Sequence, residues 1–268
     1  MDTLLQETIT ITQAAGAAIM EYYQSDFSVK DKKPDNPVTD ADYAADRLLR
    51  ERLLDLLPEA GWLSEETADN PERLEKEAVW VVDPLDGTKE FVMGIPEFTV
   101  SVALVEKGQP VLGIILNPVT EEVYCARRGG GVTRNGTAAT TSGRVELAGA
   151  RVDASRSEMK RGEFEPFVSQ MDVNVMGSIA YKLARVAAGQ ADATWSRGPK
   201  NEWDICAGVL LVQEAGGRCV DLDDEAFAFN RPYPKVNGII ADNGRLHEQV
   251  LAALAPHGAA RVEKMPPR

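Results

Sequence analysis

The stretch "VWVVDPLDGTKEF", Val79 to Phe91, places two carboxylates directly behind an apolar run. The four apolar residues predict a buried strand, which Asp83 closes. Pro84 fixes one backbone torsion, so the turn can direct Asp83, Asp86 and the Leu85 carbonyl towards one point. Carboxylate and carbonyl oxygens are the ligands that Mg²⁺ prefers in proteins. The stretch therefore indicates a candidate magnesium site at the end of a strand.

The next two residues, Gly87 and Thr88, are expected to begin a helix. The first N–H groups of a helix have no partner inside it, and they bind phosphate without a net positive protein. The same pattern is also typical of a strand-to-helix turn whose aspartates cap the helix. Both interpretations remain open from this stretch alone.

Three other stretches carry acids next to a predicted strand or helix end. They are "NPVTDAD" (Asn36–Asp42), "LSEE" (Leu63–Glu66) and "EWDICAG" (Glu202–Gly208). Taken singly, "LSEE" is typical of a solvated loop, and Asp204 of a helix N-cap. Together they supply further carboxylates at places where a site can form.

Composition excludes several classes of function. The chain has 268 residues and a net charge of -13, so a nucleic-acid polymer would be repelled on average. No apolar run is long enough to span a membrane, and the N-terminus lacks the basic region of a signal peptide. Three scattered cysteines and two histidines near the C-terminus disfavour a disulfide framework and a histidine-based site. We expect a cytoplasmic protein with reduced thiols.

Hydrophobic periodicity predicts layered helices and strands rather than a regular β-α repeat. Residues 25–38 are expected to form a loop, and residues 98–136 antiparallel hairpins. Helices are expected over 3–23, 40–57, 177–191, 202–217 and 244–256, and further strands over 61–66, 78–82, 151–155, 192–196, 218–222 and 236–242.

The small-residue connector 138–150 suggests a boundary between two lobes. The N-terminal lobe, 1–149, would carry most of the acids, and the C-terminal lobe, 150–268, would supply Asp204 and substrate contacts. The tail 261–268 is expected to be loosely packed. The fold class is mixed α/β, or α+β.

The four motifs "NPVTDAD", "LSEE", "DPLDGTKEF" and "WDICAG", in this order and spacing, resemble the inositol monophosphatase superfamily of Mg²⁺-dependent, Li⁺-sensitive phosphatases. The resemblance covers roughly Ala14 to Gly217. It implies the layered αβαβα sandwich of that superfamily. It also implies two or three Mg²⁺ ions that activate a water for attack on a small phosphate ester.

The resemblance also implies roles for individual residues. Asp42 and Thr88 would orient and deprotonate the attacking water, with Glu66 as a nearby acid. The metal would be held by Glu65, Asp83, Asp86, Asp204 and the Leu85 carbonyl, and the substrate by Gly87, Thr88, Gly177, Ser178, Arg197 and Lys200. Homodimers are common among such enzymes, so a homodimer is also possible.

Two details resemble bacterial 3'(2'),5'-bisphosphate nucleotidases. Lys89-Glu90-Phe91 follows "DPLDGT", and "RGPKNE" precedes "WD". Inositol enzymes have a sugar-binding glutamate where this chain has Ser196 or Arg197. The resemblance thus implies cleavage of 3'-phosphoadenosine 5'-phosphate to AMP, with Lys182, Arg197 or Lys200 contacting the second phosphate.

Other functions remain as alternatives. Inositol-1-monophosphatase and fructose-1,6-bisphosphatase belong to the same superfamily. A phosphatase with an aspartyl nucleophile would have one residue between its aspartates, whereas Pro84 and Leu85 both intervene here. A metal-dependent phosphate or nucleotide sensor would lack the water-activating pair of Asp42 and Thr88.

Overall fold

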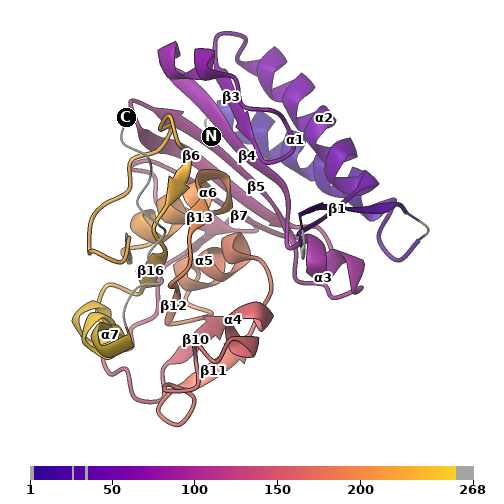
Figure 1. Ribbon diagram of the computed structural model, residues 1–268. Helices are drawn as coiled ribbons and strands as arrows, with labels where there is room; N and C mark the ends of the chain where they lie inside the picture. The colour runs from indigo at the N-terminus through magenta and orange to yellow at the C-terminus, as the bar shows by residue number, and fades with distance from the viewer. Residues whose placement is uncertain (1–2, 26, 34–35, 258–268) are drawn as a thin grey trace.

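The computed structural model describes residues 3–25, 27–33 and 36–257, and the larger of its two main sheets is mixed (Figure 1). Its strands lie in the order β3 (Gly61–Ser64), β4 (Ala78–Asp86), β5 (Thr99–Glu106), β6 (Gln109–Asn117), β7 (Glu122–Arg127), β8 (Val132–Arg134) and β9 (Thr137–Ala139). Strands β3 and β4 are parallel, and from β4 onwards every neighbouring pair is antiparallel. The hairpins predicted between residues 98 and 136 are therefore present.

A second sheet of five strands lies beyond this one. Its order is β11 (Asp172–Val175), β10 (Arg151–Ala154), β12 (Ala193–Ser196), β16 (Ile239–Asp242) and β14 (Arg218–Val220). Two small ribbons complete the strands: β1 (Val29–Lys33) with β2 (Asn36–Thr39), and β13 (Lys200–Asn201) with β15 (Lys235–Val236).

Helices form three layers around and between the two sheets. Helices α1 (Thr3–Met20) and α2 (Asp40–Leu56) cover the outer face of the larger sheet, and α5 (Ile179–Ala187) and α6 (Glu202–Glu214) lie between the sheets. Helix α7 (His247–Leu254) and the segment after α4 (Arg156–Lys160) pack on the far side of the smaller sheet. The sequence of layers is αβαβα, which confirms the predicted fold class.

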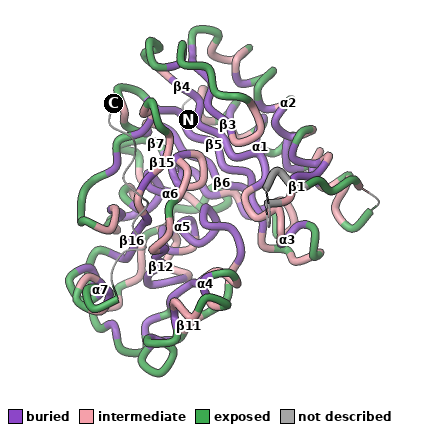
Figure 2. The backbone as a smooth tube through the Cα atoms, viewed as in Figure 1, coloured by how far each residue is buried: buried purple, intermediate pink, exposed green. Residues whose placement is uncertain are grey.

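Strand β4 is apolar on both faces because each face is covered by a layer of helices. Trp80 and Val82 pack against the core under α1 and α2, whereas Val79 and Val81 face α5 and α6. Successive side chains of a strand point to opposite faces, so a strand between two helix layers is apolar throughout. Figure 2 shows this stretch as continuously buried tube. Packing on both faces of β4 therefore fixes the position of its end, where the acids begin.

Three features differ from the sequence-based expectations. The loop predicted over residues 25–38 contains the antiparallel ribbon of β1 and β2. Helix α4 and strand β11 lie in a region where periodicity gave no prediction. The larger sheet ends at Ala139 and the smaller one begins at Arg151, but α5 and α6 share one core with strands of both sheets. The two predicted lobes therefore have a common core, and the tail 261–268 lies outside the described residues.

Candidate functional site

Carboxylates from three separate elements converge at one end of the larger sheet. One oxygen each from Glu65, Asp83 and Asp204 lies within 4.8 Å of the others. Glu65 directly follows β3, Asp83 lies in β4, and Asp204 lies in the first turn of α6. Helix α6 lies between the two sheets. This position places Asp204 beside Glu65 and Asp83, which come more than a hundred residues earlier in the chain.

A bulge at the end of β4 aims the next residues. Asp83 pairs with Ser101 and Asp86 with Thr99, so β4 has one extra residue opposite β5. Bulges interrupt the alternation of a strand and redirect its side chains. The Leu85 N–H donates to Asp83 Oδ1 at 3.0 Å, which fixes the turn between the two aspartates.

Asp86 binds the start of α5 rather than the helix that follows it in sequence. Its Oδ2 accepts from the Ser178 hydroxyl at 2.6 Å and from the Ala180 N–H at 2.7 Å. The N-cap of α3 (Thr88–Val92) is Gly87, not an aspartate. The alternative in which these aspartates cap the following helix is therefore wrong, and Asp86 links β4 to the middle helix layer.

Gly87 allows the tight turn from β4 into α3. Its φ is 103°, which L side chains rarely adopt, and a Cβ there would lie 2.9 Å from the Glu97 carbonyl oxygen. Thr88, next in sequence, has its hydroxyl 3.1 Å from both Asp42 Oδ1 and the Leu85 carbonyl oxygen. Helix α3 (Thr88–Val92) has only five residues, so its dipole is small and any anion held here would depend on local N–H groups.

Asp42 and Asp204 occupy equivalent positions in their helices. Asp42 is the third residue of α2 and accepts from the Thr39 N–H at 2.7 Å. Asp204 is the third residue of α6 and accepts from the Asn201 N–H at 2.8 Å. Each belongs to a capping box, so the predicted N-cap at Asp204 is in fact Asn201. Capping thus fixes Oδ2 of each carboxylate, while Asp42 Oδ1 accepts from the Thr88 hydroxyl and Asp204 contributes to the cavity lining.

Burial and mutual repulsion disfavour ionisation of these acids. Burial, followed by the charges of Glu65, Asp86 and Asp204, raises the pKa of Asp83 well above its usual range. Burial likewise raises the pKa of Asp86 to about 6, against the lowering effect of Ser178 and Ala180. Burial and the charges of Glu65 and Asp86 raise the pKa of Asp204 to about 7. A divalent cation would offset this repulsion, and the all-oxygen donor set suits Mg²⁺.

A cavity of about 380 Å³ opens beside these acids. Of the residues predicted for metal and substrate, Glu65, Asp83, Leu85, Asp86, Gly87, Thr88, Gly177, Ser178, Lys200 and Asp204 line it. Asp42 and Glu66 are not among the lining residues. Asp42 accepts from the Thr88 hydroxyl, and the Glu66 N–H lies 3.4 Å from the Ser64 hydroxyl.

Arg197 does not line the cavity either. Its guanidinium donates to the His257 carbonyl at 2.8 Å and lies 3.9 Å from Glu163. The end of β12 thus directs this side chain towards the C-terminal segment. The structure therefore does not bring Arg197 to the cavity, where the predicted substrate contact would require its side chain.

The lining also includes residues that sequence reasoning missed, among them Glu158 and Arg161. Glu158 lies 3.2 Å from the buried Lys182 ammonium, which also lines the cavity. A signal for this region exists in "SRSE", Ser155 to Glu158, because Ser followed by Glu three residues later is the capping-box pattern.

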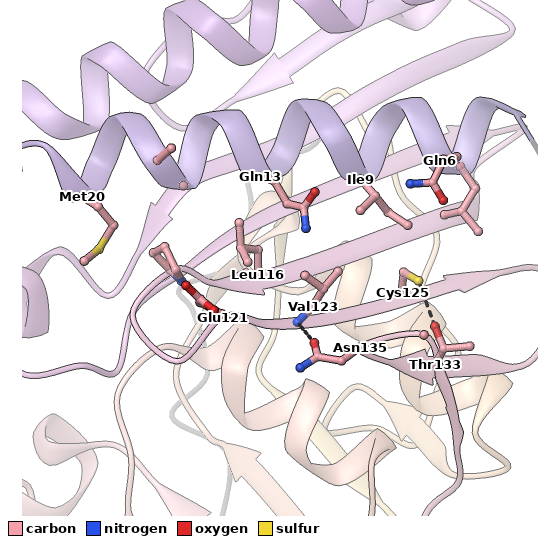
Figure 3. Close-up of a pocket in the computed structure, with 15 residues that line it drawn as sticks. Gln6, Ile9, Gln13, Met20, Leu116, Glu121, Val123, Cys125, Thr133 and Asn135 are labelled. Carbon is pink, nitrogen blue, oxygen red and sulfur yellow. Dashed lines mark hydrogen bonds between the residues drawn. The ribbon is translucent and has the colours of Figure 1, made fainter.

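A larger cavity of about 720 Å³ lies elsewhere, between α1 and strands β6 to β8 (Figure 3). Its walls include Leu5, Ile9, Met20 and Leu116, and its lining has a single acid, Glu121. No group of converging carboxylates is found there among the described residues. The smaller, acidic cavity is therefore the candidate functional site.

Comparison with known proteins agrees with this geometry. The model of the "Inositol monophosphatase family" matches residues 1–259. The chain belongs to the inositol monophosphatase family. Its members are metal-dependent phosphatases, so the protein is a phosphomonoester hydrolase that requires a metal, for which Mg²⁺ is the ion used in the family.

The relatives carry different substrate names. An inositol-1-monophosphatase from Mesorhizobium japonicum is 38% identical over 72% of this chain and 74% of its own length. The 3'(2'),5'-bisphosphate nucleotidase CysQ from Aggregatibacter actinomycetemcomitans is 32% identical over 87% of this chain and 90% of its own. The solved Thermotoga maritima IMPase matches with a TM-score of 0.86 and 28% identity over 96% of this chain and 98% of its own. The family is thus shown, but these names do not select one substrate.

No helix in the described part of the chain has the length and apolar character needed to cross a membrane. The family acts on small phosphorylated substrates, which fits a cavity of this size.

Proposed function

We propose that the protein is a 3'(2'),5'-bisphosphate nucleotidase that converts 3'-phosphoadenosine 5'-phosphate to AMP and phosphate. The observation that carries this proposal is the presence of Lys182 and Lys200 in the cavity that contains the acids. A substrate with a second phosphate needs a cation in the cavity to bind that phosphate, whereas an inositol hydroxyl does not. The relative named as a nucleotidase supports the same choice.

The two lysines have different surroundings. Lys182 is held by Glu158, with both side chains buried. Burial has the largest effect on Asp204 and Glu158 and raises the pKa of both carboxyls. Lys200, in β13, lies close enough to act in the opposite direction and lower both pKa values. Lys200 is therefore our candidate for the second phosphate, with Lys182 supporting it. Arg197 has no role in this proposal, because its guanidinium binds the His257 carbonyl.

The metal would be held by Glu65, Asp83, Asp86, Asp204 and the Leu85 carbonyl. When bound, two or three Mg²⁺ ions would neutralise the phosphate dianion and lower the pKa of a water. The Gly87 and Thr88 N–H groups and the Gly177 and Ser178 backbone would position the substrate. The Ser178 hydroxyl already donates to Asp86, so it acts mainly by holding that carboxylate.

The Thr88 hydroxyl and Asp42 would supply the base. Thr88 donates to Asp42 Oδ1, which leaves its lone pairs free to accept a proton from the attacking water. The proton would pass through the hydroxyl to the carboxylate. Glu66, next to Glu65, would be a nearby acid whose charge acts on the buried Asp83.

Rival substrates share the same chemistry. Inositol 1-phosphate and fructose 1,6-bisphosphate are the alternatives, and the relative named as an inositol-1-monophosphatase is the more identical one. A phosphoaspartate intermediate would indicate the aspartyl-nucleophile mechanism instead. Metal-dependent binding without hydrolysis of any substrate would indicate a sensor, which the family assignment disfavours.

The test is a comparison of kcat/KM for the three substrates, in wild type and in Lys200→Met. We expect the bisphosphonucleotide to be the best substrate and its KM to rise in the variant. The KM for inositol 1-phosphate should stay unchanged, because that substrate has no second phosphate. A preference for inositol 1-phosphate in wild type would overturn the proposal.

Three further properties belong to this proposal. Li⁺ should inhibit the enzyme by competing with Mg²⁺, which a lithium titration at fixed Mg²⁺ measures. The three cysteines are free and buried, which suits the reducing cytoplasm. A homodimer stays a prediction that light scattering after size exclusion tests.

A further inference from the structure

Arg73 is a buried charge outside the cavity. It lies in the short helix η1 (Pro71–Glu75), and its side chain is only 1% exposed. Its guanidinium donates to both carboxylate oxygens of Asp69, to the Asn230 side-chain oxygen at 2.5 Å and to the Arg231 carbonyl at 3.0 Å. Gly61 leaves room for it, since a Cβ there would lie 2.9 Å from Arg73 Cβ. A planar guanidinium with several fixed donors is suited to joining two loops.

Glu202 binds the same loop from the other side. Its side chain is 0% exposed and accepts from the Asn230 N–H at 2.6 Å and from the Arg231 N–H at 3.2 Å. The Glu202 N–H in turn donates to the Pro234 carbonyl. The loop 230–234 is therefore fixed to the first residue of α6 and, through Arg73, to η1.

These contacts join the two segments that carry metal-site acids. Glu65 begins the segment that leads from β3 to η1, and Asp204 follows Glu202 by two residues in α6. The Glu65 segment is also held on its other side, because Asp46 accepts from Ser64 at 2.5 Å and from Thr67 at 2.8 Å. Side-chain contacts on both sides of the Glu65 segment thus restrict the distance between Glu65 and Asp204.

We propose that Arg73, Asn230 and Glu202 form a clamp that sets the spacing between Glu65 and Asp204 for metal binding. The three are positioning residues, since none of them lines the cavity. The inference rests on the proposed metal role of Glu65 and Asp204. Buried ion pairs are weak contributors to stability compared with apolar packing, so a network of this kind is better explained by the geometry that it imposes.

The test is the Mg²⁺ dissociation constant, measured by calorimetry on the whole protein without substrate. The variants are Arg73→Met, Glu202→Gln and Asn230→Gly. Asn230 has a φ of 58°, so glycine keeps the backbone conformation while it removes the amide that meets Arg73. We expect each variant to weaken Mg²⁺ binding about tenfold or more, as loss of groups that orient metal ligands does. The Arg73→Lys variant should still bind Mg²⁺ more weakly than wild type, because a lysine ammonium lacks the planar, fixed donors of a guanidinium.

A control away from the clamp is Arg151→Met, at a position where the arginine side chain is 47% exposed. Arg151 also donates to both oxygens of a buried aspartate, Asp192, but at the far end of β10 from the cavity. The control should lower thermal stability and leave Mg²⁺ affinity unchanged.

Two other results would overturn the proposal in distinguishable ways. If Glu65→Gln weakens Mg²⁺ binding but the clamp variants bind it as wild type does, the clamp has only a structural role. If Glu65→Gln and Asp204→Asn also bind Mg²⁺ normally, the metal assignment itself fails.

Discussion

The Thr88 hydroxyl lies 3.1 Å from Asp42 Oδ1, although 46 residues separate the two. The other oxygen of Asp42 is occupied by the Thr39 N–H and hydroxyl, at 2.7 and 2.6 Å. Oδ1 is the oxygen that lies next to the Thr88 hydroxyl and would receive a proton through it. The helix cap of α2 thus also fixes the proposed base in one orientation.

Replacing Thr88 with Val should remove the proton path while it preserves side-chain shape. We expect kcat to fall about 100-fold or more, the size typical of a lost general base, with little change in KM. Thr88→Ser retains the hydroxyl and should keep most of the activity. Steady-state kinetics at saturating Mg²⁺ measure both, and a Val variant with wild-type kcat would refute the assigned role.

Mg²⁺ should stabilise the protein more at pH 8 than at pH 5. The pKa values of Asp86 and Asp204 rise from 3.8 to about 6 and about 7 in the metal-free fold, first because of burial. Because these pKa values are raised in the fold, protonation of the two carboxyls stabilises the folded protein. This contribution to the free energy of unfolding is fully present below pH 3.8 and is lost as pH rises to about 7. Mg²⁺ binds the ionised form, so its effect on Tm should grow over the same window. A Tm shift independent of pH would contradict this account.

The buried pair of Glu158 and Lys182 should contribute to stability only above acidic pH. Burial raises the Glu158 pKa, but Lys182, Lys200 and hydrogen bonds outweigh it and hold the pKa below the usual 4.5. The contribution is therefore present above pH 4.5 and lost as pH falls below it. Glu158→Gln leaves a buried, unpaired lysine and should cost about 3 kcal/mol at pH 7. Chemical denaturation should show this difference shrinking towards pH 3; a constant difference would count against the pair.

Gly177 should tolerate no side chain. A Cβ there would lie 2.5 Å from Glu90 Cγ and 2.7 Å from the Glu97 carbonyl oxygen. Gly177→Ala must displace Ser178 and with it the hydrogen bond to Asp86, so we expect weaker Mg²⁺ binding and reduced kcat/KM. Gly198→Ala is the control, since a Cβ there meets nothing within 4 Å. Equal behaviour of the two variants would show that the space at Gly177 is unimportant.

The strand and helix patterns were sufficient to predict most elements and to place acids at their ends, whereas the grouping of Glu65, Asp83, Asp86 and Asp204 came from the family resemblance. Trp80 and Val82 alternate with Val79 and Val81 because both faces of β4 are covered, and such local patterns are readable from sequence. The direction of Arg197 was not readable, because it depends on where residue 257 lies. The contact of Arg73 with Asn230, 157 residues apart, is likewise set by tertiary packing alone.

The most direct test of the central claim compares wild type with Asp83→Asn for Mg²⁺ binding and Mg²⁺-dependent phosphate release. Burial, followed by the charges of Glu65, Asp86 and Asp204, raises the pKa of Asp83, so the metal-free variant should fold at least as stably as wild type. We expect the folded variant to lose both metal binding and phosphate release. A folded Asp83→Asn protein that binds Mg²⁺ and hydrolyses phosphate esters as wild type does would contradict the account.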